Sequence, residues 1–408
     1  MTPPPDAPSP PAAAPTLAES IAAALAARGV RRMFGVPGGG SSLDLIDAAA
    51  RAGISFVLCR TETAAAIMAA VTGELTGVPG VVLTGIGPGA ASVVNGIAYA
   101  SLERAPVVLF TDTHEDGATA PPHQIFDQRA LFAPVTKAQR RLSPETGAAD
   151  IAALLDLAAA EPPGPVHIDL SAGDAASPVA EAPPSVDVAE LSEDAAALQD
   201  HAVARARELI AASRRPAIVV GLQARTPARA AAARALVGAL GGSAMTTYKA
   251  AGTVATDDPQ FAGVFTGAKS DGAVLGAADL IVFGGVDPVE MVPAKWTYDA
   301  PAIVLSETAG LAWPFVPAVE IAGPVADTAA RLADAAPADR WPAGEIAALR
   351  TGLKDAAALT GSGHTAETVL GGLIAAAPPG TRLAVDAGAH MFSAMTGWPV
   401  QAPHDILK

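Results

Sequence analysis

Glu62 occupies a position in the sequence where a carboxylate can carry out acid–base chemistry. It follows the apolar segment 54–58, which is predicted to be a strand, and it lies at the start of the helix predicted over 61–75. Folds of the α/β class bind ligands at the carboxyl ends of their parallel strands, so a carboxylate at this junction can reach a bound molecule. Glu62 can equally serve only to complement the dipole of the helix that it begins. The residue alone does not decide between these two roles.

Glycine-rich turns follow two other predicted strands. Pro37-Gly38-Gly39-Gly40 comes after the strand 32–36, and Gly87-Pro88-Gly89 comes after the strand 78–83. Glycine lets the backbone approach a ligand closely and adopt conformations that other residues avoid. The same glycines would also suit tight turns that bind nothing.

The elements that position these residues alternate between helix and strand. Helices are expected over 17–28, 41–52, 61–75 and 91–102, with strands over 32–36, 54–58, 78–83, 107–110 and 165–170. Ser41 or Ser42 is expected to cap the second of these helices. Continuous apolar strands separated by helices are typical of a parallel sheet that is covered on both faces.

The same α/β alternation returns further along the chain. Strands are expected over 217–220, 280–283, 302–305, 319–321 and 382–385, with helices over 227–241, capped by Thr226, and 365–376. Composition shifts rich in Pro and Ala separate the units. We therefore predict tandem doubly wound parallel-sheet domains at 16–175 and 201–340 and the incomplete start of a third at 365–408, with linkers at 176–200 and 341–364 and a disordered tail at 1–15.

Composition and charge exclude several classes of protein. The formal net charge is −15 and no basic stripe occurs, which argues against a nucleic-acid partner. No apolar run approaches the ~18 residues of a membrane-spanning helix, and residues 1–15 lack the features of a signal peptide. The single cysteine, Cys59, suits a reducing cytoplasm. His114, Glu115 and Asp116 lie too close together in an irregular loop to converge on one ion, so no metal site is predicted.

Five segments in a fixed order carry a resemblance to a known family. They read FGVPGGGSS, RTETAAA, GVPGVVLTGIGPGAASVVNGIAYA, RAPVVLFTD and GPVHIDLS. This succession resembles the pyrimidine-binding domain of thiamine-diphosphate-dependent enzymes of the acetolactate synthase, pyruvate oxidase and benzoylformate decarboxylase type. The resemblance continues through a central domain to Asp386-Ala387-Gly388-Ala389-His390, which is similar to the opening of the family's diphosphate-binding domain.

The resemblance implies a role for each candidate residue. Glu62 would be the catalytic glutamate that hydrogen-bonds a ring nitrogen of the cofactor's aminopyrimidine and favours the tautomer that generates the reactive ylide. The cofactor-binding positions implied are Pro37, Gly38, Gly87, Pro88 and Ser92. His123 and Gln124 would face the substrate, although His123 can also be an exposed loop histidine.

Some residues depart from the family pattern. Thr61 and Thr63 flank Glu62 where many relatives have His and Gln, and Ser92 stands where many synthases have Asn. These changes leave the specific substrate open. The motif that holds Mg²⁺ and the diphosphate, Gly-Asp-Gly followed by Asn-Asn, is not recognisable, because the only asparagine is Asn95.

Several functions follow as expectations. The resemblance implies a decarboxylase or carboligase that uses thiamine diphosphate and Mg²⁺, acts on a 2-oxo acid and assembles as a homodimer or larger oligomer. We expect the 408-residue chain alone to be C-terminally truncated and inactive, so the alternative is a catalytically incomplete fragment or a partner-dependent subunit. FAD in the central domain is possible but unsupported. A nicotinamide-dependent dehydrogenase is disfavoured, because neither Gly221 nor Gly284-Gly285 belongs to a G-x-G-x-x-G pattern.

Overall fold

The computed structural model describes residues 14–115, 123–124, 126–179, 193–342, 344–357 and 363–408. The chain divides into two compact units, Met1–Val188 and Ala189–Lys408, and each has its own parallel sheet and its own core. Apart from residues 14 and 15, the predicted tail lies outside the described residues. None of the helices in the described ranges is both long and apolar enough to cross a membrane.

The first unit contains a six-stranded parallel sheet with the order β2-β1-β3-β4-β6-β5. Its strands are β1 (Arg32–Val36), β2 (Ser55–Leu58), β3 (Gly80–Thr84), β4 (Val107–Thr113), β5 (Ala138–Arg141) and β6 (Pro165–Ser171). The strand β3 is buried along its whole length, as expected for a strand with helices on both sides.

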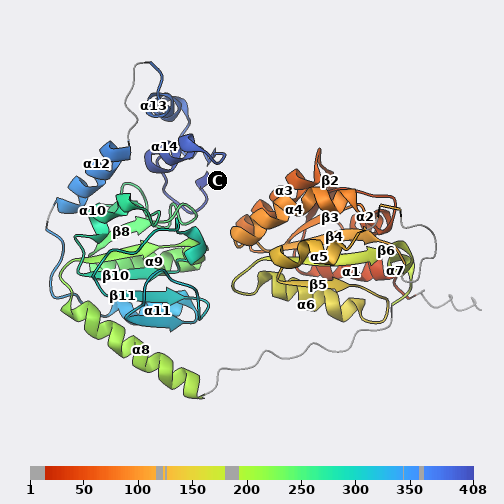
Figure 1. Cartoon of the computed structure of the whole chain (residues 1–408), viewed down its shortest axis with the longest axis horizontal. Helices are drawn as coiled ribbons and strands as arrows, with labels where there is room; N and C mark the ends of the chain where they lie inside the picture. Colours follow the sequence, from red (N-terminus) through yellow and green to blue (C-terminus); the bar gives the residue numbers. More distant parts are fainter. Residues whose placement is uncertain (1–13, 116–122, 125, 180–192, 343, 358–362) are drawn as a thin grey trace, which may run out of the picture. The chain divides into compact units, whose positions relative to one another are not determined.

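Helices cover both faces of this sheet (Figure 1). One face carries α1 (Leu17–Ala27), α2 (Ser41–Arg51), α6 (Gly147–Ala159) and α7 (Ala172–Ala176). The other face carries α3 (Glu62–Thr76), α4 (Pro88–Leu102) and α5 (Gln128–Phe132). The predicted doubly wound α/β fold is therefore confirmed for this unit.

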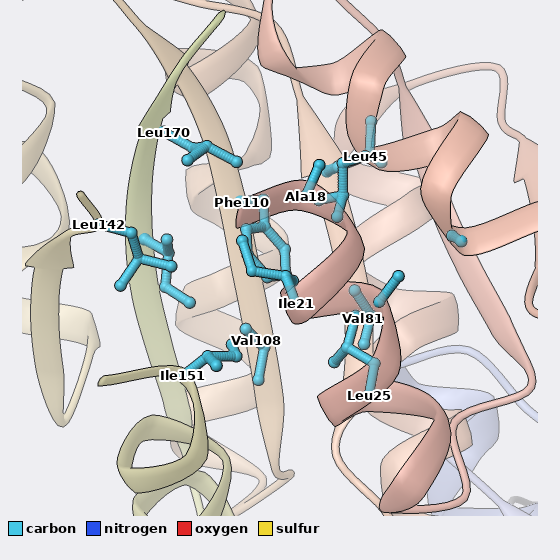
Figure 2. Packing of buried hydrophobic residues seen from close by; sticks show 14 of the residues in the cluster. Ala18, Ile21, Leu25, Leu45, Val81, Val108, Phe110, Leu142, Ile151 and Leu170 are labelled. Carbon is cyan, nitrogen blue, oxygen red and sulfur yellow. The ribbon is translucent and has the colours of Figure 1, made fainter. Parts of the chain in front are cut away.

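Apolar side chains on the two faces of the strands form two separate cores. On β4, Val108 and Phe110 face the α1 side, where Figure 2 shows them packed near Ile21 and Ile151. The intervening Val107 and Leu109 face α3 and α4. This alternation follows from the two-residue period of a strand.

The second unit repeats this architecture, with the sheet order β12-β11-β10-β7-β8-β9. Its strands are β7 (Pro216–Val220), β8 (Ser243–Thr246), β9 (Phe261–Val264), β10 (Leu280–Gly284), β11 (Ala302–Ser306) and β12 (Val319–Ala322). One face carries α8 (Glu193–Ala212), α9 (Pro227–Leu240) and α11 (Val325–Ala333), and the other carries α10 (Gly272–Leu275) and α12 (Glu345–Ala357). Short 3₁₀ turns occur in this unit at η2 (Leu222–Ala224), η3 (Lys269–Asp271) and η4 (Pro288–Glu290), and in the first unit at η1 (Ala133–Val135).

The last part of the chain belongs to this second unit. It contains α13 (Ala366–Ala376), α14 (Ala389–Gly397) and the short parallel pair β13 (Leu383–Ala384) and β14 (Ile406–Leu407). Met391, Trp398 and Val400 pack with Ala251 of the loop after β8 in a small core. Two helices overlap ranges that the sequence predicted as linkers: α8 begins at Glu193 within the linker 176–200 and continues beyond it, and α12 lies within the linker 341–364.

Candidate functional site

The carboxyl edge of the first sheet has a switch in direction between β1 and β3. These strands are neighbours, and the chain leaves β1 towards α2 on one face but leaves β3 towards α4 on the other. Loops that diverge in this way open a crevice, which is the usual ligand position in an open α/β sheet. The glycine-rich turn 37–40 and the segment 85–89, which contains the Gly87-Pro88-Gly89 turn, therefore meet at this point.

A cavity of about 420 Å³ lies in this crevice. Gly38 and Gly85 line it from the two turns, Asp112 lines it from β4, and His123 and Gln124 line it from the segment before α5. Three of the predicted site residues, Gly38, His123 and Gln124, are thus brought to one cavity. Its volume lies within the range of small-molecule sites.

Asp112 is a site residue that the sequence analysis did not single out. Its buried carboxylate accepts hydrogen bonds from the backbone N–H of Ser42 at 2.8 Å and from the hydroxyls of Ser41 at 2.7 Å and Ser42 at 2.8 Å. The expectation that Ser41 or Ser42 caps α2 is wrong, because the N-cap is Gly40 and it makes no side-chain cap bond. The acceptor for the backbone N–H groups at the start of α2 is instead the Asp112 carboxylate, which comes from β4. The only sequence signal was its position as the polar end of RAPVVLFTD.

The two turns touch each other closely at Gly38. A Cβ atom at this position would lie 2.2 Å from the Asp112 Oδ2 atom and 2.9 Å from the Gly85 Cα atom. Only glycine fits there without displacing one of these neighbours. The preceding Pro37 occupies the first position after β1, between the strand and this contact.

Gly87 is constrained even more strongly. Its φ is +58°, and a Cβ atom would lie 1.7 Å from the carbonyl oxygen of Gln124. Its N–H donates to the Gln128 Oε1 atom at 2.7 Å. Pro88 then occupies the first turn of α4, where proline is well tolerated.

Gln128 ties this turn to the ends of two strands. Its buried Nε2 donates to the Asp169 Oδ1 atom at 3.0 Å and to the Asp112 carbonyl at 3.2 Å. Burial opposes ionisation of Asp169, yet hydrogen bonds from His167, Thr111 and Gln128 hold the pKa of Asp169 below its usual range. This hydrogen-bond network holds the Gly87 turn against the ends of β4 and β6. No local pattern in the sequence predicted it.

Glu62 is the first residue of α3, and Thr61 is the N-cap whose hydroxyl accepts the N–H of Ala64 at 3.2 Å. The Glu62 carboxylate is partly buried and points to the Gly87-Pro88-Gly89 turn, because a Cβ atom on Gly89 would lie 3.7 Å from its Oε1 atom. Glu62 does not line the 420 Å³ cavity.

Ser92 lies beside α3 rather than in the cavity. Its carbonyl accepts a hydrogen bond from the Thr63 hydroxyl at 2.6 Å, and its side chain is exposed. Gly96 allows the close approach of the two helices, since a Cβ there would lie 2.5 Å from the Ala66 Cβ. The contact between α3 and α4 therefore sets the distance between Glu62 and the glycine turn.

The segment before α5 is held mainly through its backbone. The His123 carbonyl accepts a hydrogen bond from His114 Nε2 at 3.0 Å, while the imidazole of His123 is exposed. Gln124 adopts a left-handed conformation with φ +58°. Asp127 caps α5, accepting the N–H of Ala130 at 2.9 Å.

The described residues contain no group of three or more His, Cys, Asp or Glu side chains arranged to hold a metal ion. Glu115, which the sequence placed beside His114, instead accepts hydrogen bonds from the Gly173 N–H at 2.7 Å and the Ser171 hydroxyl at 2.9 Å. These bonds give Glu115 a structural role at the start of α7.

Comparison with known proteins places this architecture in a family. Residues 15–131 match "Thiamine pyrophosphate enzyme, N-terminal TPP binding domain" and residues 203–332 match "Thiamine pyrophosphate enzyme, central domain". The chain is 32% identical over 325 residues to the catabolic acetolactate synthase of Raoultella terrigena, covering 78% of this chain and 57% of the relative. It is 31% identical over 327 residues to an acetolactate synthase of Bacillus subtilis, covering 76% of this chain and 55% of the relative.

A third relative is the large subunit of acetolactate synthase isozyme 2 of Escherichia coli. It is 29% identical over 301 residues, which cover 70% of this chain and 52% of the relative. The chain thus spans about half the length of the curated relatives that it matches. On the two matched domains and these relatives, the chain belongs to the family of enzymes that use thiamine pyrophosphate, also called thiamine diphosphate.

Proposed function

We propose that this protein acts as a thiamine-diphosphate-dependent decarboxylase or carboligase on a 2-oxo acid, in the manner of an acetolactate synthase, and that Glu62 is its acid–base residue. The observation that carries the proposal is the position of the Glu62 carboxylate at the start of α3, beside the Gly87-Pro88-Gly89 turn. The acetolactate synthases among its relatives support the substrate class.

The residues present fit the aminopyrimidine part of the cofactor. The turns at 37–40 and 85–89 carry no side chain at Gly38, Gly39 and Gly89, which are partly or fully exposed, whereas Gly87 is buried against Gln124. A flat heterocycle can therefore lie against them. Glu62 is the acidic side chain beside the second turn, and a carboxyl group can either donate a proton to a ring nitrogen or accept one from it.

The chain's own contribution to the reaction would then be to hold and return one proton at the pyrimidine ring of the cofactor. When bound, thiamine diphosphate supplies the electron sink for decarboxylation of the 2-oxo acid. Glu62 would hold a proton at the pyrimidine nitrogen and return it, while α3 and α4 keep the carboxylate at a fixed distance from the turn. We propose that Pro37, Gly38, Gly87 and Pro88 pack against the pyrimidine.

We further propose that the cavity receives the 2-oxo acid, with His123 and Gln124 facing it. Both residues line the cavity, and the exposed imidazole of His123 leaves its ring nitrogens available to a carboxylate. Ser92 lies outside this cavity, so a role for it in binding the cofactor rests on the family pattern alone. Residues for Mg²⁺ and the diphosphate are not assigned, because the described part of the chain offers no suitable cluster.

FAD is not part of the proposal. At the end of β7 the N–H of Leu222 donates to Glu290 at 3.0 Å, and the N–H of Gln223 donates to the Gly285 carbonyl at 2.9 Å. The backbone donors of this turn are thus engaged within the chain, whereas a dinucleotide phosphate would need them.

We also propose that the active protein is a homodimer or a larger oligomer. The helix α3 buries Ala65, Ala69 and Gly73 against its own unit but leaves Ile67 and Met68 on its outer side 37% and 42% exposed. A helix that is apolar on more than one face favours burial on more than one side. A second copy of the chain would provide that cover.

The experiment that tests the role of Glu62 is a substitution in the holoenzyme that contains this chain. We expect Glu62→Gln to slow deuterium exchange at the cofactor's thiazolium carbon, followed by NMR, and product formation from pyruvate by about 10²–10⁴-fold. Gln keeps the volume but cannot share the proton. Asp44→Asn is the matched control, because Asp44 is a first-turn carboxylate of α2 and its loss has the same effect on a helix dipole. Equal rates in Glu62→Gln and the control would show that Glu62 only begins a helix.

A further inference from the structure

A second cavity, of about 360 Å³, lies in the second unit between the start of α9 and residues 401–404. Arg225, Arg234 and His404 line it together with the apolar Pro227 and Ala230. The chain as a whole has a formal charge of −15. A cavity lined by several cationic side chains therefore differs in charge from the rest of the chain. The proposed function uses no residue of this cavity.

The cations are held in place by the surrounding chain. Arg225 is only 9% exposed. Arg234 donates to the Thr253 carbonyl at 3.0 Å, which fixes its guanidinium beside the cavity. Arginine side chains that are already ordered lose little entropy when they bind a ligand.

The pKa of His404 lies below its usual value, first because of burial and then because of nearby positive charge. Burial lowers the pKa of His404, and the positive charges of Arg225, Arg382 and Lys249 lower it further, while Asp405 acts in the opposite direction. Asp405 is itself engaged, because its Oδ2 atom accepts the N–H groups of Gln401 and Ala402 at 2.9 Å each. Positive charge thus exceeds negative charge among the groups that act on this imidazole.

The wall formed by residues 400–405 is fixed to the loop that follows β8. The Thr256 N–H donates to the Val400 carbonyl at 2.9 Å, and the Val400 N–H donates to the Thr256 hydroxyl at 3.1 Å. Gly252, with φ +85°, packs so closely that a Cβ atom would lie 2.0 Å from the Ala402 carbonyl oxygen. The cavity is therefore preformed, and binding would not have to order it.

The helix α9 adds to the same field. It has 14 residues, begins at Pro227, and Thr226 caps it. The amino end of a helix carries the equivalent of about half a positive charge. Pro227 and Ala230 of its first turn and Arg234 of its third turn line the cavity.

We propose that this cavity binds a small phosphate-bearing metabolite, with the phosphate group held between Arg225, Arg234 and His404. A phosphate presents three terminal oxygens and up to two charges, which matches two guanidinium forks and an imidazole better than a carboxylate does. The volume is near the lower end of the range for ligand sites, so the organic part must be small. This site is separate from the one proposed around Glu62, which lies in the other unit.

The probe for this site is inorganic phosphate, and the reporter is the His404 imidazole, assigned by comparison with His404→Gln and titrated by NMR. We expect phosphate to raise the pKa of His404, because a bound anion stabilises its protonated form. We expect acetate at the same ionic strength to leave it unchanged. A His404 pKa that is unchanged by phosphate, or that acetate raises equally, would overturn the proposal.

Variants then show which cations are used. By calorimetry, Arg234→Gln and Arg225→Gln are each expected to weaken phosphate binding by roughly tenfold or more, since each removes charge-assisted hydrogen bonds. Arg205→Gln is the matched control, because Arg205 pairs with Glu208 on the exposed surface of α8. Arg234 is exposed, so its substitution tests the site even where Arg225→Gln disturbs folding. Equal affinity in Arg234→Gln and the control would contradict the assignment.

Discussion

Gly87 is the residue of the candidate site at which the backbone tolerates the least change. Its left-handed conformation strains any other residue, and the carbonyl oxygen of Gln124 occupies the place of a Cβ atom. Gly77 offers a matched comparison, because it is also left-handed, at φ +71°, but has nothing within 4 Å of a Cβ atom. The two positions therefore separate conformational strain from a steric clash.

We expect Gly77→Ala to lower the free energy of unfolding by about 1 kcal/mol, the cost of a left-handed alanine. Gly87→Ala is expected to cost a further ~1–3 kcal/mol, because Gln124 must move. Urea unfolding followed by far-UV circular dichroism measures both. Equal losses would show that the contact with Gln124 is not tight in solution.

At the scale of elements, the contact between α3 and α4 governs the position of Glu62. Gly96 lies where the helices meet, with a Cβ position 2.5 Å from the Ala66 Cβ and 2.8 Å from the Thr63 carbonyl oxygen. Gly238 in α9 is also helical, but a Cβ there would meet nothing within 4 Å. Substitution by alanine should therefore lower the stability of the folded protein at Gly96 and raise it at Gly238.

We expect Gly96→Ala to destabilise the protein by about 1–3 kcal/mol, because the helices must separate. Gly238→Ala is expected to stabilise it by up to about 1 kcal/mol, because alanine reduces the entropy of the unfolded chain without a clash. Thermal unfolding by calorimetry gives both signs. A stabilising Gly96→Ala would mean that the helices are not in close contact.

At the scale of the whole molecule, the half-buried Glu290 in the second unit makes stability depend on pH. Glu290 accepts hydrogen bonds from Leu222 and Asp287 N–H groups and from the Thr247 hydroxyl, which joins the loops after β7, β8 and β10. Burial raises the pKa of Glu290 to about 7 from the usual 4.5, the charge of Asp287 adds to this, and the three hydrogen bonds offset part of it.

Glu290 loses its proton near pH 4.5 in the unfolded chain but only near pH 7 in the folded chain. Between these two values the folded chain therefore holds a proton that the unfolded chain has lost. The stabilisation is fully present below pH 4.5 and is lost as the pH rises through this window, by a total on the order of 3 kcal/mol. We expect Glu290→Gln to remove this loss. The exposed Glu320 provides the control, Glu320→Gln.

Tryptophan fluorescence in urea reports this transition, because all four tryptophans lie in the second unit, at Trp296, Trp313, Trp341 and Trp398. Measured at pH 5, 6 and 7, the control should show the same falling free energy of unfolding as the unmodified protein. An equally steep fall in Glu290→Gln would contradict the assignment of the proton to Glu290.

Self-association is the second property of the whole molecule that can be tested. We expect the chain to sediment as a dimer or larger species at micromolar concentration, with the outer side of α3 buried. Met68→Glu should shift it towards monomer, because an unpaired charge would be buried in the interface. Leu198→Glu is the control, since Leu198 is 73% exposed on α8 in the second unit. A monomer in the unmodified protein, or no effect of Met68→Glu, would contradict the proposed interface.

Much of the fold could be predicted from local patterns in the sequence. The strand 32–36 and the start of the helix after Thr226 agree with the structure at the residue level. Apolar strands and glycine turns depend on neighbours within a few residues, so a short window of sequence contains the information. The polar edge strand β5, with the sequence AQRR, and the short β8 and β9 were missed because they lack that pattern.

By itself, the sequence determined that Glu62 begins a helix after a strand, that glycine turns follow two strands, and that these motifs resemble one family. Only the tertiary structure decided that Asp112 caps α2 across about seventy residues of chain and that Gln128 holds the Gly87 turn. These bonds join residues that are distant in sequence, and they exist because the strand order β2-β1-β3-β4-β6-β5 places the ends of β3, β4 and β6 side by side. Strand order depends on how all the helices pack, and no local window of sequence contains it.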